Sequence, residues 1–466
     1  MKDRTETQAH ARGLAEFAAS VQLSDIPPDV RARGLLHILD GLGLGLASTR
    51  HDFAASAVAG VAALSAGDDR CTMIGQTLRA APRDAALANG ILIHGLDFDD
   101  THQQAIVHPT AACLPAALAI AEERGMSGEA LLVAYCIGME AAIRIGAAVQ
   151  GGFHHTGFHA TGIVAHFASA LSAGRLLGLG PDALVAAQGI AASTASGVQV
   201  FLEEGAWTKR FHPGWAAVGG ITAATFAQHA FRGPSRAYEG RFGLFETHLQ
   251  GDGHDLAPAF LTDALGARWM MADTALKPYP VCHFIHGAAD AALSAHEEIA
   301  GSPIAEVEIR LPADTMPIVA EPQAAKRAAA TEYEAKFSAH YVVGTCLLRG
   351  AFTLADLTGD ALADPAVKAL MPRVTCVIDQ DSAFPTYFSG GVRVRLEDGR
   401  VVDRHVRVNS GAGERMMDRD AVSAKFHANA DPVLGHERSA SLRQTVLNLG
   451  SRSARELARG LSGSTE

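Results

Sequence analysis

The chain has 466 residues, of which 48 % are hydrophobic and only 6 % aromatic, and its formal net charge is −11. This acidic balance, without any basic stripe, argues against a nucleic-acid partner. The length predicts two or three domains, since one domain usually takes about 150 residues. Alanine and glycine are abundant, and small side chains let helices approach closely, so we expect a tightly packed helical body.

The cysteines and the N-terminus bear on the compartment. The six cysteines are scattered and form no CxxC pair, which argues against a zinc knuckle or a thioredoxin-type site. The first twelve residues are polar and lack the apolar core of a signal peptide. No uninterrupted apolar run reaches the length of a membrane span. We therefore predict a cytoplasmic protein with reduced thiols and no membrane partner.

Most of the chain has the periodicity of helices. From about residue 5 to residue 265, apolar residues recur at three- and four-residue spacing, as in 128–148 and 181–198. A second helical stretch covers 421–461. A helix of small residues is also expected over 216–230.

The pattern changes after about residue 273. Alternation of period two, which is typical of half-buried strands, appears in four segments: 305–311, 374–379, 391–396 and 401–408. Asp398-Gly399 is a strong turn signal between the last two, and a helix is expected over 331–348. The chain is thus predicted to be mainly α. A large all-helical domain comprises 1–272 and 406–466, and a smaller α+β lid domain comprises 273–405.

The stretch from His94 to His102 reads HGLDFDDTH, and His108 follows it. Buried charges cost several kcal/mol unless partners compensate, so such a cluster in an apolar context indicates chemistry. On a helix His94, Asp97 and Thr101 would share one face and present a base, an acid and a hydroxyl to one ligand. Asp99 would point elsewhere and cap or pair. The alternatives are a metal site or a structural charge cluster paired to an arginine.

Three further segments carry candidate site residues. His159 lies in GFHATG, where a loop is expected to enter a helix. Lys209 and His212 lie in TKRFHPG, from which cations could grip carboxylates. Lys277 lies where the pattern changes from helical to mixed, and domain junctions favour ligand sites. Each segment also has a structural alternative. His159 would then be a hydrogen-bonded histidine of the surface or core, the segment with Lys209 and His212 a solvated positive turn, and Lys277 a lysine in a linker.

These segments together resemble the MmgE/PrpD family, which includes 2-methylcitrate dehydratases, cis-aconitate decarboxylases and iminodisuccinate epimerases. The match covers nearly the whole chain in the same order, with further support from GPSRAYEG at 233–240 and YEAKFSAHYVV at 333–343. The resemblance implies a helical domain built from both ends of the chain, a lid domain and a cleft between them. It also implies a homodimer and no metal or organic cofactor.

The resemblance also implies roles for individual residues. The catalytic set is His159, His108, Asp97, Lys209 and Lys277. The substrate-binding set is Thr101, Lys209, His212 and Lys277. Two departures stand out: the spacing from Thr101 to His108 is one residue longer than in decarboxylase-type members, and 317–322 lacks the tyrosine that those members tend to carry after the first lid strand.

The family's reactions all create carbanion character on a carbon next to a carboxylate. Lysines can stabilise that charge, His159 and His108 can move the proton, and Asp97 can orient an imidazole. The favoured function is a cofactor-independent lyase on a small di- or tricarboxylate, with a 2-methylcitrate dehydratase-like reaction. The alternatives on this fold are an iminodisuccinate-like epimerase or a cis-aconitate-like decarboxylase. Alternatives of other classes are a metal-dependent hydrolase using HxxDxDD and a non-catalytic binding protein.

Overall fold

The computed structural model describes residues 9–65, 67–251 and 255–463. Residues 1–8 of the polar N-terminal stretch lie outside the described residues. The chain is 61 % helical and 9 % strand, which confirms the mainly α fold class. It forms two compact units, one of Met1–Thr274 with Asp418–Glu466 and one of Ala275–Met417.

The second boundary between the units differs from the predicted position after residue 405. The segment 406–417 belongs to the smaller unit. Hydrogen bonds hold it there: the Leu276 N–H donates to the Gly411 carbonyl, and the Ser410 N–H donates to Asp290 at 2.6 Å. Sequence periodicity does not report such contacts, because an irregular segment has no period.

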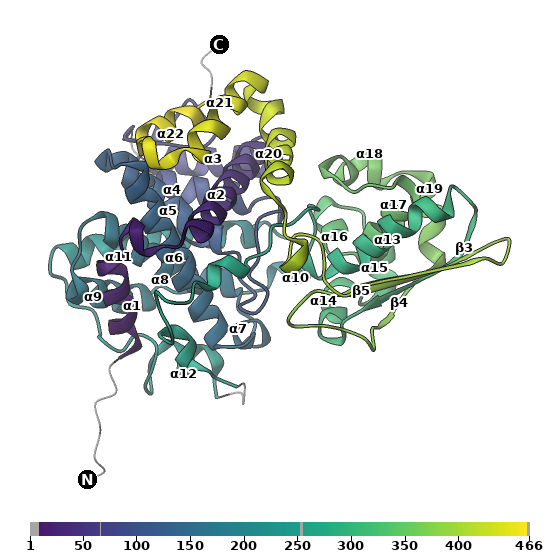
Figure 1. Ribbon diagram of the computed structural model, residues 1–466, viewed down its shortest axis with the longest axis horizontal. Coiled ribbons are helices and arrows are strands. Elements are labelled where there is room, and N and C mark those ends of the chain that lie inside the picture. The colour runs from purple at the N-terminus through teal and green to yellow at the C-terminus, as the bar shows by residue number, and fades with distance from the viewer. Residues whose placement is uncertain (1–8, 66, 252–254, 464–466) are drawn as a thin grey trace, which may run out of the picture. The chain divides into compact units, whose positions relative to one another are not determined.

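The larger unit is helical apart from a two-stranded hairpin of β1 (Cys71–Thr72) and β2 (Arg79–Ala80), which the sequence pattern did not predict. Its helices, coloured from purple to teal and again in yellow in Figure 1, have the following bounds. They are α1 His10–Ser20, α2 Pro28–Ser48, α3 Asp52–Leu64, α4 Pro82–His94, α5 Pro109–Arg124, α6 Gly128–Ala148, α7 Gly152–His155, α8 Ala160–Leu176, α9 Pro181–Ala192, α10 Phe201–Glu204, α11 Thr208–Gln228, α12 Leu244–Leu249, α20 Arg419–Leu434, α21 His436–Leu447 and α22 Ala454–Leu461.

Helix α8 lies at the centre of the larger unit, where it packs against α5, α6, α9 and α11. Nearly every residue of α5, α6 and α8 is buried. Helix α6 is long and apolar enough to cross a membrane, but 94 % of its apolar window is buried within the protein. Such burial is typical of a core helix in a globular protein. The cytoplasmic location stays a prediction.

Helices α4 and α11 cross at a pair of glycines. A Cβ on Gly90 of α4 would lie 2.5 Å from the Gly214 Cα, and one on Gly214 would lie 2.4 Å from the Leu87 carbonyl oxygen. This close approach explains why α11 begins at Thr208 and continues through Pro213-Gly214, whereas the sequence predicted a start at residue 216. The contact with α4 compensates for two residues that normally break helices.

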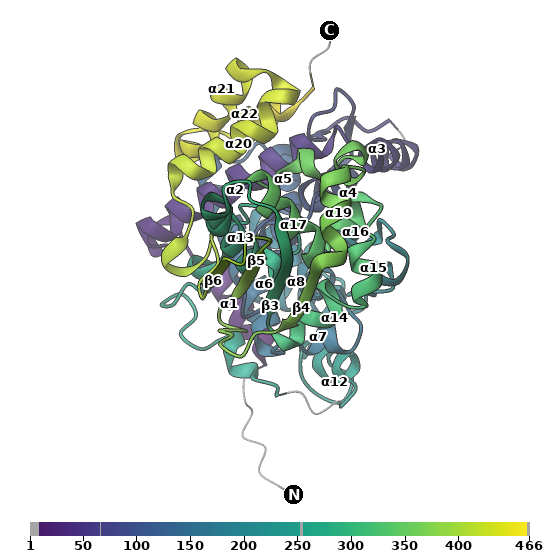
Figure 2. The same ribbon diagram turned by 90° about the vertical axis from the view of Figure 1, so that its right-hand side faces the viewer.

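The smaller unit contains a four-stranded sheet of order β4-β3-β5-β6 (Figure 2). Strand β3 (Ile304–Leu311) pairs parallel with β4 (Val374–Ile378) and antiparallel with β5 (Gly390–Leu396), and β5 pairs antiparallel with β6 (Val401–Val406). Helix α13 packs on β5 and β6 and against α17. The helices of this unit are α13 His286–Ile299, α14 Met316–Val319, α15 Gln323–Arg327, α16 Glu332–Lys336, α17 Ala339–Arg349, α18 Gly359–Leu362 and α19 Pro365–Leu370.

The strands fall within a residue or two of the predicted segments, and Gly399 adopts the positive φ of +89° that the predicted turn requires. The single helix predicted over 331–348 is instead two, α16 and α17, with a break at Phe337 and Ser338. Ser338 causes the break, since its hydroxyl accepts a hydrogen bond from the Tyr341 N–H at 3.0 Å and caps α17.

Candidate active site

The HGLDFDDTH segment is not helical beyond its first residue. Helix α4 ends at His94, and the chain then runs as a loop to His108, which precedes α5. Asp97 has a φ of +54°, a left-handed conformation that interrupts the helix. The predicted common helical face of His94, Asp97 and Thr101 is therefore wrong, and these side chains meet other partners through the fold of the loop.

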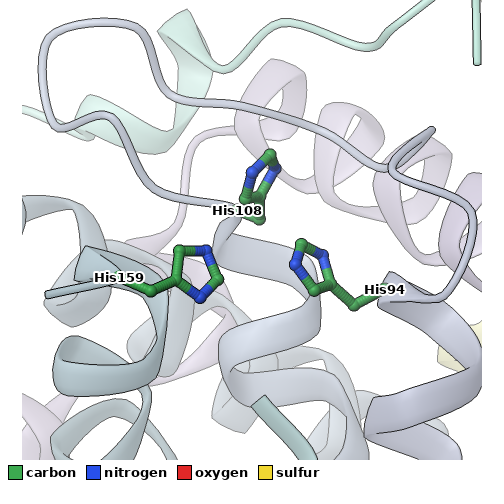
Figure 3. A group of neighbouring side chains, drawn as sticks. All are labelled: His94, His108 and His159. Carbon is green, nitrogen blue, oxygen red and sulfur yellow. The ribbon is translucent and has the colours of Figure 1, made fainter. Parts of the chain in front are cut away.

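Three histidines from separate segments come together beside this loop (Figure 3). The ring of His94 lies 4.8 Å from that of His108 and stacks on that of His159 at 5.5 Å, measured between centroids. The His108 and His159 rings are 6.2 Å apart. His159 precedes α8, as the predicted loop-to-helix entry requires. His94 was not among the predicted site residues, although its position in the charged cluster was a usable signal.

Each imidazole of this histidine cluster is held from behind through Nδ1. His94 Nδ1 lies 2.8 Å from the Asp99 carboxylate, and His159 Nδ1 lies 3.0 Å from His212 Nδ1. His108 Nδ1 lies 2.8 Å from the Asp100 carbonyl oxygen and 3.3 Å from the Thr101 hydroxyl. Because a carbonyl can only accept, His108 carries its proton on Nδ1.

Lys209 and Asp97 form a buried ion pair. Lys209 lies in the first turn of α11, and its Nζ donates to Asp97 Oδ1 at 2.8 Å. Only 11 % of the lysine side chain and 8 % of the aspartate side chain are exposed. Asp99 is the carboxylate that contacts the His94 imidazole, and Asp97 accepts from Lys209; the orientation of an imidazole by Asp97 stays a prediction.

A second buried network holds the loop between α4 and α5 in place. Asp100 accepts from the Thr110 hydroxyl at 2.6 Å, and its carboxylate lies 2.8 Å from His37 Nδ1. Lys425 of α20 donates to the Phe98 carbonyl at 2.9 Å and pairs with Asp40 of α2 at 2.8 Å. The C-terminal segment therefore holds the loop that carries the candidate site, a contact that no local sequence pattern signals.

Burial sets the protonation states around the cluster. Desolvation, followed by electrostatic interaction with the neighbouring His94 and Lys209, lowers the pKa of His159 well below its ordinary value. Burial likewise lowers the pKa of His212 and of His154 to about 4. His159 and His212 are thus neutral imidazoles at pH 7, and one of the two must donate in the bond that joins them.

Lys277 belongs to the smaller unit and is buried there with 1 % of its surface exposed. Its place in the site stays a prediction.

The metal-hydrolase alternative relied on HxxDxDD, yet all three carboxylates of that motif are engaged, with Lys209, His94 and Thr110. In the histidine cluster, the residues spaced closely enough to share a metal ion are all histidines: His94, His108 and His159.

The sequence matches known family models over most of its length. The MmgE/PrpD N-terminal domain matches residues 12–257, and the MmgE/PrpD C-terminal domain matches residues 279–450. The chain belongs to the MmgE/PrpD family. This result confirms the resemblance inferred from the four charged segments, all of which lie inside or at the edge of the matched ranges.

Several relatives of the chain are named for one activity. A cis-aconitate decarboxylase-like protein of Aspergillus oryzae is 28 % identical over 94 % of this chain and 93 % of its own length. The human cis-aconitate decarboxylase is 28 % identical over 88 % of this chain and 86 % of its own length. The cis-aconitate decarboxylase of Aspergillus terreus is 29 % identical over 60 % of this chain and 58 % of its own length. Family and relatives together support an enzyme of the lyase type.

Proposed function

We propose that this protein is a cofactor-independent lyase that acts on a small tricarboxylate by proton transfer at a carbon next to a carboxylate. The observation that carries the proposal is that the neutral imidazole of His159 lies beside His94 and His108 and near the buried ammonium of Lys209. His159 and His108 are the proton-transfer groups, and Lys209 is the cation for the substrate's carboxylates. A developing carbanion needs such a cation in a site that excludes water.

Each residue has a defined task in the proposal. Lys209 and Thr101 bind carboxylates, His212 holds the His159 ring through their Nδ1 contact, and Lys277 supplies a further cation. In decarboxylation the bond to the leaving carboxylate breaks, its electron pair moves toward the carbon next to a remaining carboxylate, and an imidazolium delivers the proton there. A bound polyanion raises the pKa of His159, which lets this ring carry that proton.

Decarboxylation of a cis-aconitate-like tricarboxylate is the reaction that we favour. Its support is the activity for which relatives that align over nearly the whole chain are named. The earlier preference from sequence, a 2-methylcitrate dehydratase-like reaction, becomes the second candidate. Two observations favour dehydration: the buried imidazoles are neutral and ready to remove a proton, and 317–322, which overlaps α14, contains no tyrosine.

Proton NMR of the purified protein in D₂O tests the proposal, with cis-aconitate, 2-methylcitrate, citrate and iminodisuccinate each in turn. We expect cis-aconitate to lose carbon dioxide and the product to carry deuterium next to a carboxylate. A new olefin from 2-methylcitrate would instead establish dehydration. Deuterium exchange with inversion of iminodisuccinate would establish epimerisation.

Absence of turnover with all four compounds, in folded protein, would contradict a lyase acting on these polycarboxylates. Replacement of His159 or Lys209 by alanine serves as the second arm. Turnover that survives both replacements would contradict the catalytic roles given to these residues.

We also propose that the protein is a homodimer. Apolar side chains at the surface support this: Leu202 of α10, Trp207 immediately before α11, and Phe211 and Trp215 of α11 are each half-exposed. Phe211 and Trp207 also line a cavity of about 300 Å³ that none of the clustered histidines lines. Light scattering should give twice the chain mass, and Trp215→Lys should give monomers. A monomeric wild type would contradict the proposal.

A further inference from the structure

The histidine cluster has the composition and the spacing of a metal site. His94, His108 and His159 each offer one ring nitrogen, and the three nitrogens lie within 4.8 Å of one another. Figure 3 shows the rings of His94, at the end of α4, and His159, before α8, pointing toward each other, with the ring of His108, before α5, standing between and above them. Ligands of a tetrahedral ion with metal–nitrogen bonds of about 2.0 Å lie about 3.3 Å apart, so binding requires the three rings to turn toward one another.

The contacts behind the rings are those that metal-binding histidines use. A ligating imidazole usually donates its other N–H to a carboxylate or a carbonyl, which fixes its tautomer. His94 Nδ1 has the Asp99 carboxylate at 2.8 Å, and His108 Nδ1 has the Asp100 carbonyl at 2.8 Å. The Nε2 atoms of His94 and His159 are buried and have no hydrogen-bond partner among the residues that the structure describes.

The charge behind the rings fits the same ligand set. A carboxylate behind a ligating imidazole orients the ring and raises its basicity. The carboxylate of Asp99 lies 3.7 Å from His108 Nδ1 as well as against His94. It therefore adds negative charge directly behind two of the three ligands.

We propose that His94, His108 and His159 bind one divalent transition-metal ion of the zinc type, with water in the fourth position. Neutral imidazoles favour Zn²⁺, Co²⁺ and Ni²⁺ over Mg²⁺ or Ca²⁺, which prefer oxygen ligands. The ion binds the ring nitrogens of His108 and His159, which the proposed lyase uses for proton transfer. It therefore acts as an inhibitor that competes with substrate, and this consequence alone rests on the proposed function.

Binding is tested without substrate. Protein stripped with chelator is titrated with Zn²⁺ by calorimetry and with Co²⁺ by visible absorption, where four-coordinate cobalt gives strong bands. We expect one ion per chain, with affinity at least 100-fold weaker in His94→Ala and in His159→Asn. The control is His427→Ala, which disrupts the other described group with ligand spacing, His427, Asp431 and His436 on α20 and α21; its affinity should match the wild type.

Circular dichroism checks that each variant is folded. X-ray absorption of the Zn²⁺-loaded wild type counts the imidazole ligands without any substitution. Three imidazoles support the site. Binding that persists in both cluster variants, binding that His427→Ala abolishes, or the absence of binding would overturn it.

Activity separates the two proposals. If both hold, the stripped enzyme turns over and Zn²⁺ inhibits it, with relief by higher substrate concentration. A site that binds Zn²⁺ in a protein without lyase activity would leave the metal site standing and remove the lyase. Activity that requires Zn²⁺ would retain the site and contradict both its inhibitory role and the cofactor-independent mechanism.

Discussion

At the scale of single residues, Lys209 carries the largest share of the proposed chemistry. Its ammonium is buried beside Asp97, so it can act on a developing negative charge with little screening by water. The same burial makes the pair sensitive, because removal of one partner leaves an uncompensated charge. A single substitution therefore changes stability and catalysis together, and a second substitution is needed to separate them.

Lys209→Met should lower kcat/KM by about 100-fold or more, since one lost donor to a developing charge costs this much. It should also destabilise the protein, because Asp97 is left buried. The double variant Lys209→Met with Asp97→Asn should recover stability in urea unfolding but not activity. Lys368→Met, at an exposed lysine of the smaller unit, is the control. Recovery of activity in the double variant would contradict the role of the lysine.

Asp99→Asn tests the support of the histidine cluster. The amide keeps the shape of the side chain but removes the charge that holds His94 Nδ1 at 2.8 Å. We expect kcat to fall by about 10- to 100-fold, with little change in KM. The acid limb of the pH–rate profile should move to lower pH, because loss of a carboxylate disfavours imidazolium. Asp314→Asn, at an exposed position, should leave both unchanged, and an unshifted limb in Asp99→Asn would count against the assignment.

At the scale of elements, the crossing of α4 and α11 sets the distance between the two halves of the candidate site. Helix α4 ends at His94, and α11 carries Lys209 and His212 in its first turns. Gly90 and Gly214 allow the helix backbones to touch, so the helices come closer than any larger side chains would permit.

Gly90→Ala should destabilise the protein by about 1–3 kcal/mol, because the new methyl group would overlap the Gly214 backbone. Activity should fall as well, since α11 must shift and carries Lys209 with it. Gly359→Ala is the matched control, because no atom lies within 4 Å of its added Cβ. Urea unfolding and steady-state kinetics measure the two effects, and unchanged stability in Gly90→Ala would contradict the close crossing.

At the scale of the whole molecule, buried histidines tie stability to pH. Burial lowers the pKa of His102, His154, His166, His212 and His340 to about 4. An unfolded histidine titrates near 6.5, so between pH 6.5 and 4 the unfolded chain binds more protons than the folded one. Stability is then lost as the pH falls through this window.

The free energy of unfolding should therefore decrease between pH 7 and pH 5, by up to about 1.4 kcal/mol per pH unit for each such histidine. Asp40, whose pKa burial raises to about 6, and Glu140, whose pKa burial also raises, work in the opposite direction but are fewer than the histidines. Urea unfolding at pH 7, 6 and 5 checks the slope. A constant or rising stability toward pH 5 would show that these imidazoles are not held neutral.

The family, the mainly α class and most strands and helices can be predicted from the order of residues alone. Period-two and helical spacing are local properties, and Gly399 in its turn or the N-cap position of His159 needs only neighbouring residues. Charge in an apolar context is also visible in one dimension, and it marks His108, His159, Lys209 and Asp97 as candidate site residues.

The tertiary structure alone decided which side chains meet. The pairing of Asp97 with Lys209, the stacking of His94 on His159 and the hold of Lys425 on the loop join segments far apart in the chain. The loop after His94, the early start of α11 and the return of 406–417 to the smaller unit also depend on distant contacts. Periodicity cannot report them, because the free energy that fixes them comes from packing and ion pairing between elements.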